Sequence, residues 1–327
     1  MICLPTDAEL RAKLEEILKT SGEVQTATAA RYLNIPESDL LAKITEWTDL
    51  RCKIQGGVII AGPSNSSGEV NINPSKLLVP HEFAVQLGIV GATVEGEFNR
   101  VMDKLAAAGV LYPAGYREAL ILKYEKTKVL YPYIFLHIGD PHIRKHGRYR
   151  EVLQCRGNLL DYGCGTGDDI RALVADGYPR QSVTGYDVNW TSITLGFDLY
   201  LDQKAWAGHF VVDKKFPFPA ETFDVVYSGS VIHTLYTQKA VKNYILKAYS
   251  ALKPRGIFFG VTLGYRKEFP PPFGKLLLSR EQLGEVFGAT GFFNIEVIEE
   301  IKEQQVYLWF YAKKLSQKGE NLLRQIN

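Results

Sequence analysis

The stretch "LLDYGCGTGDDI" at residues 159–170 decides the fold of this 327-residue chain. An apolar run carries Asp161, and three glycines follow at alternating positions, Gly163, Gly165 and Gly167. This pattern is typical of a buried strand that turns directly into a helix, where backbone amides without a neighbouring Cβ can approach a ligand closely. A Gly-rich tight turn and the nucleotide loop of a dehydrogenase are the competing explanations.

The spacing of the glycines argues against a dinucleotide ligand. The dinucleotide fingerprint has glycine at its first, third and sixth positions. Counted from Gly163, the sixth position is Asp168. A carboxylate at the start of a helix repels a phosphate group, so the loop predicts a ligand that carries no phosphate.

Two acidic residues follow the next apolar runs. Asp187 in "VTGYDVN" lies 20 residues beyond Gly167, where a carboxylate usually binds the ribose hydroxyls of a nucleotide. Asp213 in "FVVDKK" ends a third run and can accept a hydrogen bond from the exocyclic amine of adenine. Capping of a turn by either carboxylate remains the alternative explanation.

From about Tyr131 onward, short apolar runs alternate with helical stretches, as in a parallel α/β sheet. The predicted strands are "GNLLDYG", "SVTGYDV", "HFVVD", "FDVVYSG" and "IFFGVTL". After a helix at 280–291, the runs 293–301 and 305–314 are close enough in sequence to pair as an antiparallel hairpin.

The N-terminal half predicts two winged-helix-like domains, at residues 1–62 and 75–125, joined by a polar linker at 63–74. The second would have two helices around "LGIVG" and a strand after Gly109. Residues 1–60 carry nine acidic and seven basic side chains. Because a phosphate-binding surface needs an excess of bases, we expect no nucleic-acid binding, and favour a lid, a homodimer interface or a docking surface.

Composition narrows the class of protein further. The net charge of +2, with 46% hydrophobic and 23% charged residues, is ordinary for a soluble globular protein. The four cysteines form no CxxC pair and have no histidine at ligand spacing, which predicts free thiols and no metal site. The sequence has neither an apolar run of about 18 residues nor a signal-like start, so a cytoplasmic protein without a membrane segment is expected.

Four motifs together resemble a known superfamily. "LLDYGCGTGDD", "GYDVN", "FPFPAETFDVVYSGSVIHTL" and "LKPRGIFFGVTL" look like the successive motifs of class I S-adenosylmethionine-dependent methyltransferases. The resemblance covers about residues 130–313 and implies a catalytic domain at 126–317 with a Rossmann-like seven-stranded α/β sheet. "DPHIRKHGRYREVL", "ADGYP", "LGFDLYLD" and "SGSVIHTL" are also similar to fungal enzymes that methylate small molecules in specialised metabolism, including carboxyl groups of meroterpenoid precursors.

The resemblance implies S-adenosylmethionine as the cofactor, with Asp161 near its methionine amino group. This cofactor has no phosphate, a ribose diol and a sulfonium cation, which suit the carboxylates of the motifs. The expected cofactor-binding residues are Asp161, Tyr162, Gly163, Cys164, Gly165, Gly167, Asp187, Val188, Asp213, Lys214, Ser228 and Gly229. For Lys214, a plain surface charge is the alternative.

Methyl transfer from a sulfonium requires chiefly alignment and exclusion of water. A general base is needed only for an acceptor that is protonated at working pH. His233 follows the fourth strand and is the candidate catalytic residue, with capping or packing beside the cofactor as the alternative.

Two further segments are candidates for binding the acceptor. Arg144 and Tyr149 lie in a basic cluster with His137, His142 and His146, which could hold a carboxylate or form a solvated basic face. Phe269 and Phe273 in "EFPPPFGK" offer apolar contacts after the fifth strand. We therefore expect methylation of a small organic acceptor. A protein or RNA methyltransferase that recruits its substrate through the N-terminal domains, and a non-catalytic protein with this fold, are the alternatives.

Overall fold

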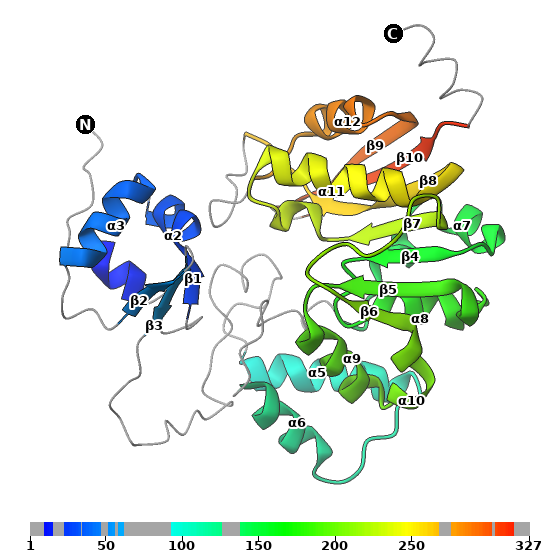
Figure 1. Cartoon of the computed structure of the whole chain (residues 1–327). Coiled ribbons are helices and arrows are strands. Elements are labelled where there is room, and N and C mark those ends of the chain that lie inside the picture. Colours follow the sequence, from blue (N-terminus) through cyan, green and yellow to red (C-terminus); the bar gives the residue numbers. More distant parts are fainter. Residues whose placement is uncertain are drawn as a thin grey trace, which may run out of the picture. The chain divides into compact units, whose positions relative to one another are not determined.

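The computed structural model describes residues 10–15, 23–33, 35–46, 52–55, 58–61, 93–125, 138–267, 276–302 and 305–316 (Figure 1). The described residues form two compact units, one between residues 10 and 61 and the other between 93 and 316. His137, Phe269, Phe273 and the "LGIVG" segment lie outside the described residues.

The first unit is a small α/β arrangement. Its elements are β1 (Glu23–Gln25), α2 (Thr26–Leu33), α3 (Glu37–Glu46), β2 (Cys52–Gln55) and β3 (Val58–Ala61). The strands form an antiparallel sheet in the order β1-β3-β2. Apolar residues at helical spacing, including Leu10, Leu14 and Leu40, form its core. The winged-helix assignment of this unit stays a prediction.

The second unit is built on a seven-stranded sheet in the order β6-β5-β4-β7-β8-β10-β9. Five strands are parallel: β4 (Leu159–Tyr162), β5 (Val183–Asp187), β6 (Phe210–Val212), β7 (Phe223–Gly229) and β8 (Leu252–Leu263). The antiparallel pair β9 (Phe292–Lys302) and β10 (Gln305–Lys314) completes it, with β10 lying between β8 and β9. The predicted strands, the closing hairpin and the Rossmann-like class are confirmed.

Helices and short 3₁₀ segments connect and cover the strands. They are η3 (His142–Lys145), α7 (Tyr149–Cys155), α8 (Asp168–Ala175), η4 (Arg180–Ser182), α9 (Trp190–Tyr200), α10 (Gln203–Trp206), η5 (Ala207–His209), η6 (Ile232–Thr234), α11 (Gln238–Ala251) and α12 (Arg280–Ala289). None of the helices in the described ranges is both long and apolar enough to cross a bilayer.

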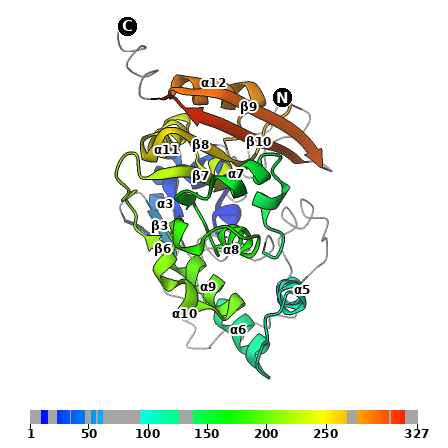
Figure 2. The same cartoon turned by 90° about the vertical axis from the view of Figure 1, so that its right-hand side faces the viewer.

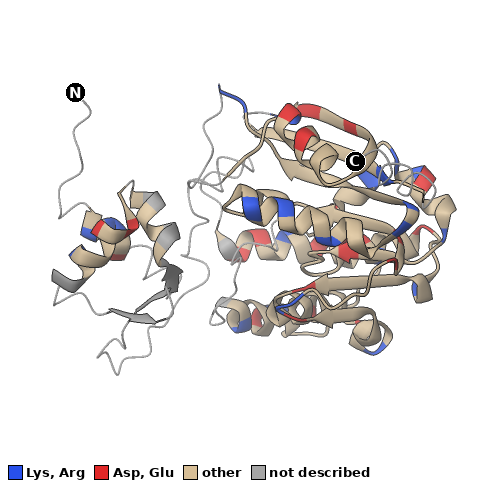
Figure 3. Cartoon of the chain, turned by 45° about the horizontal axis from the view of Figure 1, so that its top comes forward, with Lys and Arg blue, Asp and Glu red and all other residues tan. Residues whose placement is uncertain are grey.

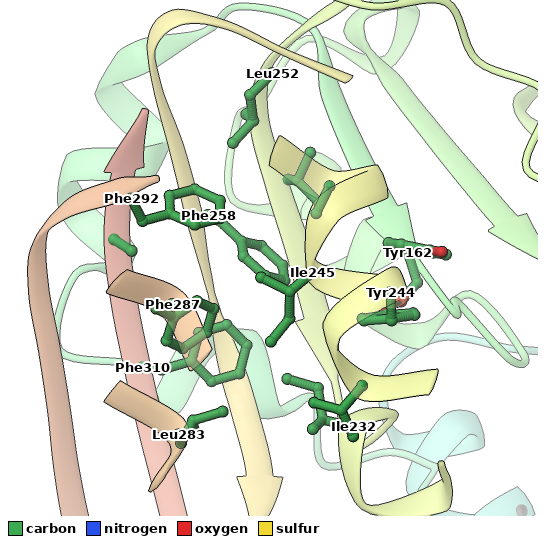
Figure 4. Close-up of a cluster of buried hydrophobic side chains, with 14 of the residues drawn as sticks. Tyr162, Ile232, Tyr244, Ile245, Leu252, Phe258, Leu283, Phe287, Phe292 and Phe310 are labelled. Carbon is green, nitrogen blue, oxygen red and sulfur yellow. Dashed lines mark hydrogen bonds between the residues drawn. The ribbon is translucent and has the colours of Figure 1, made fainter. Parts of the chain in front are cut away.

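The sheet is apolar on both faces because successive side chains of a strand point to opposite sides. Phe258 joins the core beneath α11 and α12, with Ile245, Phe287 and Phe310 (Figure 4). The next residue, Phe259, joins the core on the face that carries α8 and α9. Acidic and basic residues are interspersed over the elements of this unit (Figure 3).

Two helices that precede the sheet in sequence, α5 (Val94–Ala107) and α6 (Tyr116–Glu125), pack against α9 (Figures 1 and 2). The strand predicted after Gly109 is wrong, because residues 108–115 form turns and loop and lead into α6. Gly109 and Gly115 have φ values of +104° and +73°, and Pro113 between them has no N–H for a ladder. The two glycines and the proline therefore favour a turn between two helices over a strand.

Candidate active site

The candidate site lies where the strand order of the sheet reverses. From β4 the chain continues to β5 and β6 on one side, whereas β7 and β8 follow on the other. In such sheets, ligands bind in the crevice outside the carboxyl ends of the two central strands. Here those ends carry Gly163 and Ser230, and a Cβ on Gly163 would lie 2.3 Å from Cγ2 of Val231. The loops after β4 and β7 are therefore in direct contact.

The glycine loop is fixed by its own backbone. Gly163, Gly165 and Gly167 have φ values of +88°, +53° and +74°, a region that L-residues with a Cβ rarely occupy. The amides of Gly163 and Cys164 donate to the carbonyl of Tyr186 at 2.8 and 3.0 Å. The glycines are thus required by the turn itself, in addition to any ligand that approaches it.

Asp187 connects the glycine loop to the next strand. Its Oδ2 accepts from the amide of Gly165 and its Oδ1 from the amide of Asn189, both at 2.9 Å. Burial raises the pKa of Asp187. An ionised carboxylate has about four acceptor positions, and the amide of Val188 also stabilises this carboxylate, which leaves at least one position for a ligand hydroxyl. The capping and the ribose-binding explanations are therefore compatible. Val188, which follows, is half exposed at the same edge.

Three more acidic residues lie at the loop: the buried Asp161 before it, and the half-buried Asp168 and Asp169 in the first turn of α8. Asp161 is 2% exposed, and among the described residues its Oδ2, like Oδ1 of Asp168, has no hydrogen-bond partner. Burial and the charges of neighbouring acids raise the pKa of Asp161 well above its usual range. Burial also raises the pKa of Asp168 to about 7 and that of Asp169 to about 6. Buried, unpaired carboxylate oxygens of this kind favour a cationic ligand group.

The first turn of α8 also holds the segment that precedes α7. Oδ2 of Asp168 accepts from the amide of Gly139 at 3.0 Å, and Oδ1 of Asp169 accepts from the amide of Ile143 at 2.9 Å. This brings His142 to the site, where its Nδ1 lies 3.3 Å from Oγ of Ser230. Ser230 has a φ of +60°, and such backbone strain in a non-glycine residue is common at functional sites.

The side chains of Tyr162, Cys164 and Ser228 point into the protein. The ring of Tyr162 stacks on that of Tyr244 with centroids 3.9 Å apart, and Oγ of Ser228 lies 2.9 Å from the Tyr244 hydroxyl. Cys164 is buried, and burial raises the pKa of its thiol well above the usual value. Their side chains are engaged in packing, so only their backbone atoms face the loop.

The remaining expected cofactor residues lie at the ends of β6 and β7. Asp213 is exposed, and its Oδ1 accepts from the amide of Lys215 at 2.8 Å, as expected of a turn cap. Lys214 beside it is also exposed. Gly229 ends β7, and a Cβ there would lie 2.8 Å from the Tyr227 hydroxyl and 3.0 Å from Oδ2 of Asp169. The close approach of these two groups explains the glycine.

His233 is buried in η6 and fixed by β8. Its amide donates to Oγ1 of Thr262 at 3.0 Å, and its Nδ1 lies 3.3 Å from that oxygen and 3.4 Å from the amide of Leu263. The amide of Leu263 can only donate, whereas the hydroxyl of Thr262 can donate or accept, so the position of the ring proton depends on which of these two groups Nδ1 bonds. The contacts with β8 hold the ring of His233 in one orientation.

Arg144 and Tyr149 are not brought to the glycine loop. Arg144 forms a two-point ion pair with Asp176, with Nε–Oδ2 and Nη2–Oδ1 distances of 2.7 and 2.8 Å, and the Tyr149 hydroxyl donates to the same carboxylate at 2.6 Å. Asp176 follows the C-terminal end of α8, an eight-residue helix that starts at the glycine loop. At about 1.5 Å per residue, the two groups lie about 12 Å from the loop.

His146 has a packing role. Its Nε2 donates to the Phe310 carbonyl at 3.0 Å, its Nδ1 accepts from the amide of Arg148 at 3.1 Å, and burial lowers its pKa. The sequence did not single out Asp169, Tyr227 or Ser230 as site residues. The second aspartate of "GDD" was the available signal for Asp169. The other two depend on strand register and on a backbone angle that the sequence does not display.

Comparison with known proteins identifies the class of domain. Residues 159–256 match the family model described as "Methyltransferase domain". Over this region the chain is similar to methyltransferase domains, and the strand order of its sheet is Rossmann-like.

The particular relatives are fungal. The O-methyltransferase atr3 of Stereocaulon alpinum is 31% identical over 156 residues, which is 40% of this chain and 43% of that protein. The methyltransferase adrK of Penicillium roqueforti is 32% identical over 91 residues, covering 26% and 33% of the two chains. The asnovolin E/chermesin D methyltransferase nvfJ of Aspergillus novofumigatus is 25% identical over 139 residues, covering 39% and 50%. The matches span half or less of the length of each relative.

The residues of the site fit S-adenosylmethionine, the cofactor implied by this class of domain. The unpaired oxygens of Asp161 and Asp168 suit an ammonium group, and the open acceptor position of Asp187 suits a ribose diol. The same acidic set would repel the pyrophosphate of a dinucleotide.

Proposed function

We propose that this protein is an S-adenosylmethionine-dependent methyltransferase that methylates an oxygen atom of a small organic acid, specifically a carboxylate. The observation that carries the proposal is the set of buried carboxylates at the reversal point of the sheet, two of which keep an unpaired oxygen. The name of the relative atr3, an O-methyltransferase, supports transfer to oxygen.

The cofactor, when bound, supplies a methyl group that its sulfonium already activates. The task of the protein is then to bind, orient and exclude water. Asp161 would hold the methionine ammonium, and Asp187 would hold the ribose while its other lone pairs fix the glycine loop. Because these carboxylates are buried, their attraction for a cation is stronger than it would be in water.

The environment of His233 supports a carboxylate acceptor. We infer that Nδ1 accepts from the amide of Leu263, so that the neutral ring would carry its proton on Nε2 and could not take another proton there. A carboxylate, with a pKa of about 4, is already ionised at neutral pH and needs a hydrogen-bond donor to orient it. A phenol or alcohol would need a base instead.

Calorimetry tests the cofactor. S-adenosylmethionine and its demethylated product should both bind with dissociation constants in the low micromolar range, which corresponds to a binding free energy of about −8 kcal/mol. NAD should not bind. Tight binding of NAD without binding of either sulfonium-derived ligand would exclude this function.

Two substitutions at His233 test the acceptor class. The amide nitrogen of Gln in His233→Gln can donate near the position of Nε2 but cannot act as a base. For a carboxylate acceptor, His233→Gln should keep most of the activity and His233→Ala should lose about tenfold through poorer positioning. For a phenol or alcohol, both should lose about 10²–10⁴-fold, with partial recovery at high pH, which would contradict the carboxylate assignment.

For the N-terminal half, we propose a homodimer or docking surface in a cytoplasmic enzyme. Nine acidic against seven basic residues in 1–60 support this proposal over phosphate binding. The full chain should sediment as a dimer and should not shift duplex DNA or tRNA at physiological salt. A salt-sensitive shift would favour a methyltransferase that recruits nucleic acid.

A further inference from the structure

Arg171 is a buried cation directly behind the glycine loop. Only 8% of the residue is exposed. Its Nη1 donates to the carbonyl of Thr166 at 2.5 Å and to that of Gly167 at 3.1 Å. A Cβ on Gly167 would lie 2.8 Å from this nitrogen, so the glycine makes room for the guanidinium.

The guanidinium is itself fixed from two sides. Asp202 binds it at two points, with Nε–Oδ2 and Nη2–Oδ1 distances of 2.7 and 2.9 Å. Four aromatic rings surround its central carbon at distances of 4.3 to 6.0 Å: Tyr200, Trp206, Phe210 and Phe197. A planar fork held in this way has a single orientation, which a lysine could not reproduce.

We propose that Arg171 is a positioning residue of the cofactor site, which holds the carbonyls of Thr166 and Gly167 on the protein side of the loop. With these carbonyls fixed, the amide of Gly165 points at Asp187 and the opposite side of the loop faces the ligand. The inference rests on the proposed function only for the identity of that ligand.

The helical pair α5–α6 supports the same arrangement. Asp202 and Tyr200 lie at the C-terminal end of α9, where the last carbonyls of a helix have no partner within the helix. Two tyrosines satisfy them, Tyr112 from the loop between α5 and α6 and Tyr116 from α6: the Tyr112 hydroxyl donates to the carbonyl of Leu199 at 2.5 Å, and the Tyr116 hydroxyl to that of Asp198 at 2.9 Å. The α5–α6 region thus stabilises the segment that fixes Arg171. The two helices themselves lie outside residues 159–256, which the family model matches.

The chain offers a matched control in Lys314. This lysine is 4% exposed, its Nζ donates to the Leu252 carbonyl at 2.9 Å, and it lies 3.6 Å from the Glu221 carboxylate and 5.0 Å from the ring of Tyr249. It therefore has the same kinds of partner as Arg171. However, it lies at the end of β10 that adjoins the start of β8, at the amino ends of the parallel strands, whereas the glycine loop lies at their carboxyl ends.

The experiment compares Arg171→Met, Arg171→Lys and Lys314→Met with the unaltered protein. Each is measured for its melting temperature and, well below it, for its calorimetric affinity for S-adenosylhomocysteine. Both methionine variants should melt earlier. Arg171→Met should bind up to about a hundredfold more weakly, the scale of a small misplacement of binding groups, while Lys314→Met should stay within about threefold of the unaltered protein. Arg171→Lys should recover part of the affinity, since its ammonium can reach one carbonyl but not both.

Hydrogen exchange gives a readout that needs no ligand. The amides of Gly163, Cys164, Gly165 and Gly167 are all hydrogen-bonded, so they should exchange slowly. In Arg171→Met they should exchange faster, while in Lys314→Met they should not. Unchanged exchange and affinity in Arg171→Met, or equal losses in Lys314→Met, would overturn the inference. Failure of the unaltered protein to bind the cofactor would instead overturn the proposed function and leave the exchange result to decide the role of Arg171.

Discussion

Asp187→Ala is the substitution that tests the geometry of the cofactor site most closely. The carboxylate accepts two backbone hydrogen bonds of 2.9 Å, from the glycine loop and from the start of α9, and keeps an acceptor position toward the ligand. Loss of its contacts to a ribose diol should cost about 1–3 kcal/mol of binding free energy, the range for buried polar partners left unpaired. This equals a loss of affinity of about 5-fold to 150-fold.

A control separates this effect from general destabilisation. Asp224 also accepts a backbone hydrogen bond, from the amide of Asn158 at 2.8 Å, and pairs with Lys253 at the same distance, but it lies at the start of β7, away from the site. Calorimetric titration with S-adenosylhomocysteine should therefore show a large loss in Asp187→Ala and a change below about threefold in Asp224→Ala. Unchanged affinity in a folded Asp187→Ala protein would refute the assignment of Asp187 to the ligand.

Gly163→Ala places a Cβ 2.3 Å from Val231 at a φ of +88°, so urea unfolding should show a loss of about 1–3 kcal/mol, with partial recovery when Val231→Ala is added; no recovery would mean that the backbone angle alone matters. Because burial raises the pKa of Asp168 from 3.8 to about 7, the native state keeps a proton that the unfolded chain loses. Asp168 should therefore make the free energy of unfolding of the ligand-free protein fall between about pH 4 and pH 7, by about 1.4 kcal/mol per pH unit at most for this one proton, and Asp161 and Asp169 add to the slope. Asp168→Asn should make the profile less steep, and an equal slope in both proteins would contradict the pKa shift. Arg144→Ala should leave the KM values for cofactor and acceptor within about threefold, because its partner is an exposed carboxylate far from the loop, and a large rise in the acceptor KM would return Arg144 to the site.

The sequence predicted the features that depend on local pattern. Short apolar runs that alternate with helical stretches located the strands, and the glycines with Asp187 located the loop and its carboxylate, because both are set by neighbours within a few residues of a strand end. The strands and the glycine loop also position the site, so the place of the site in the fold could be predicted from the sequence alone.

The features that the sequence could not predict depend on which distant group a side chain meets. Arg144 and Tyr149 carry suitable chemistry for an acidic ligand, yet Asp176, 32 residues from Arg144, binds both. The proton position on His233 depends on an amide 30 residues away in β8. Arg171 is the single basic residue of α8. Its role could not be predicted from the sequence, because Asp202 and the surrounding aromatic rings lie in and beyond α9.

The most direct test of the central claim is transfer of a labelled methyl group. The purified full chain is incubated with methyl-labelled S-adenosylmethionine and, separately, with small organic acids extracted from a fungus, with protein and with RNA. Label is expected in the small-molecule fraction only, in a product that mild alkali hydrolyses to release labelled methanol, as expected of a methyl ester. Label in protein or RNA, or an alkali-stable product, would contradict it.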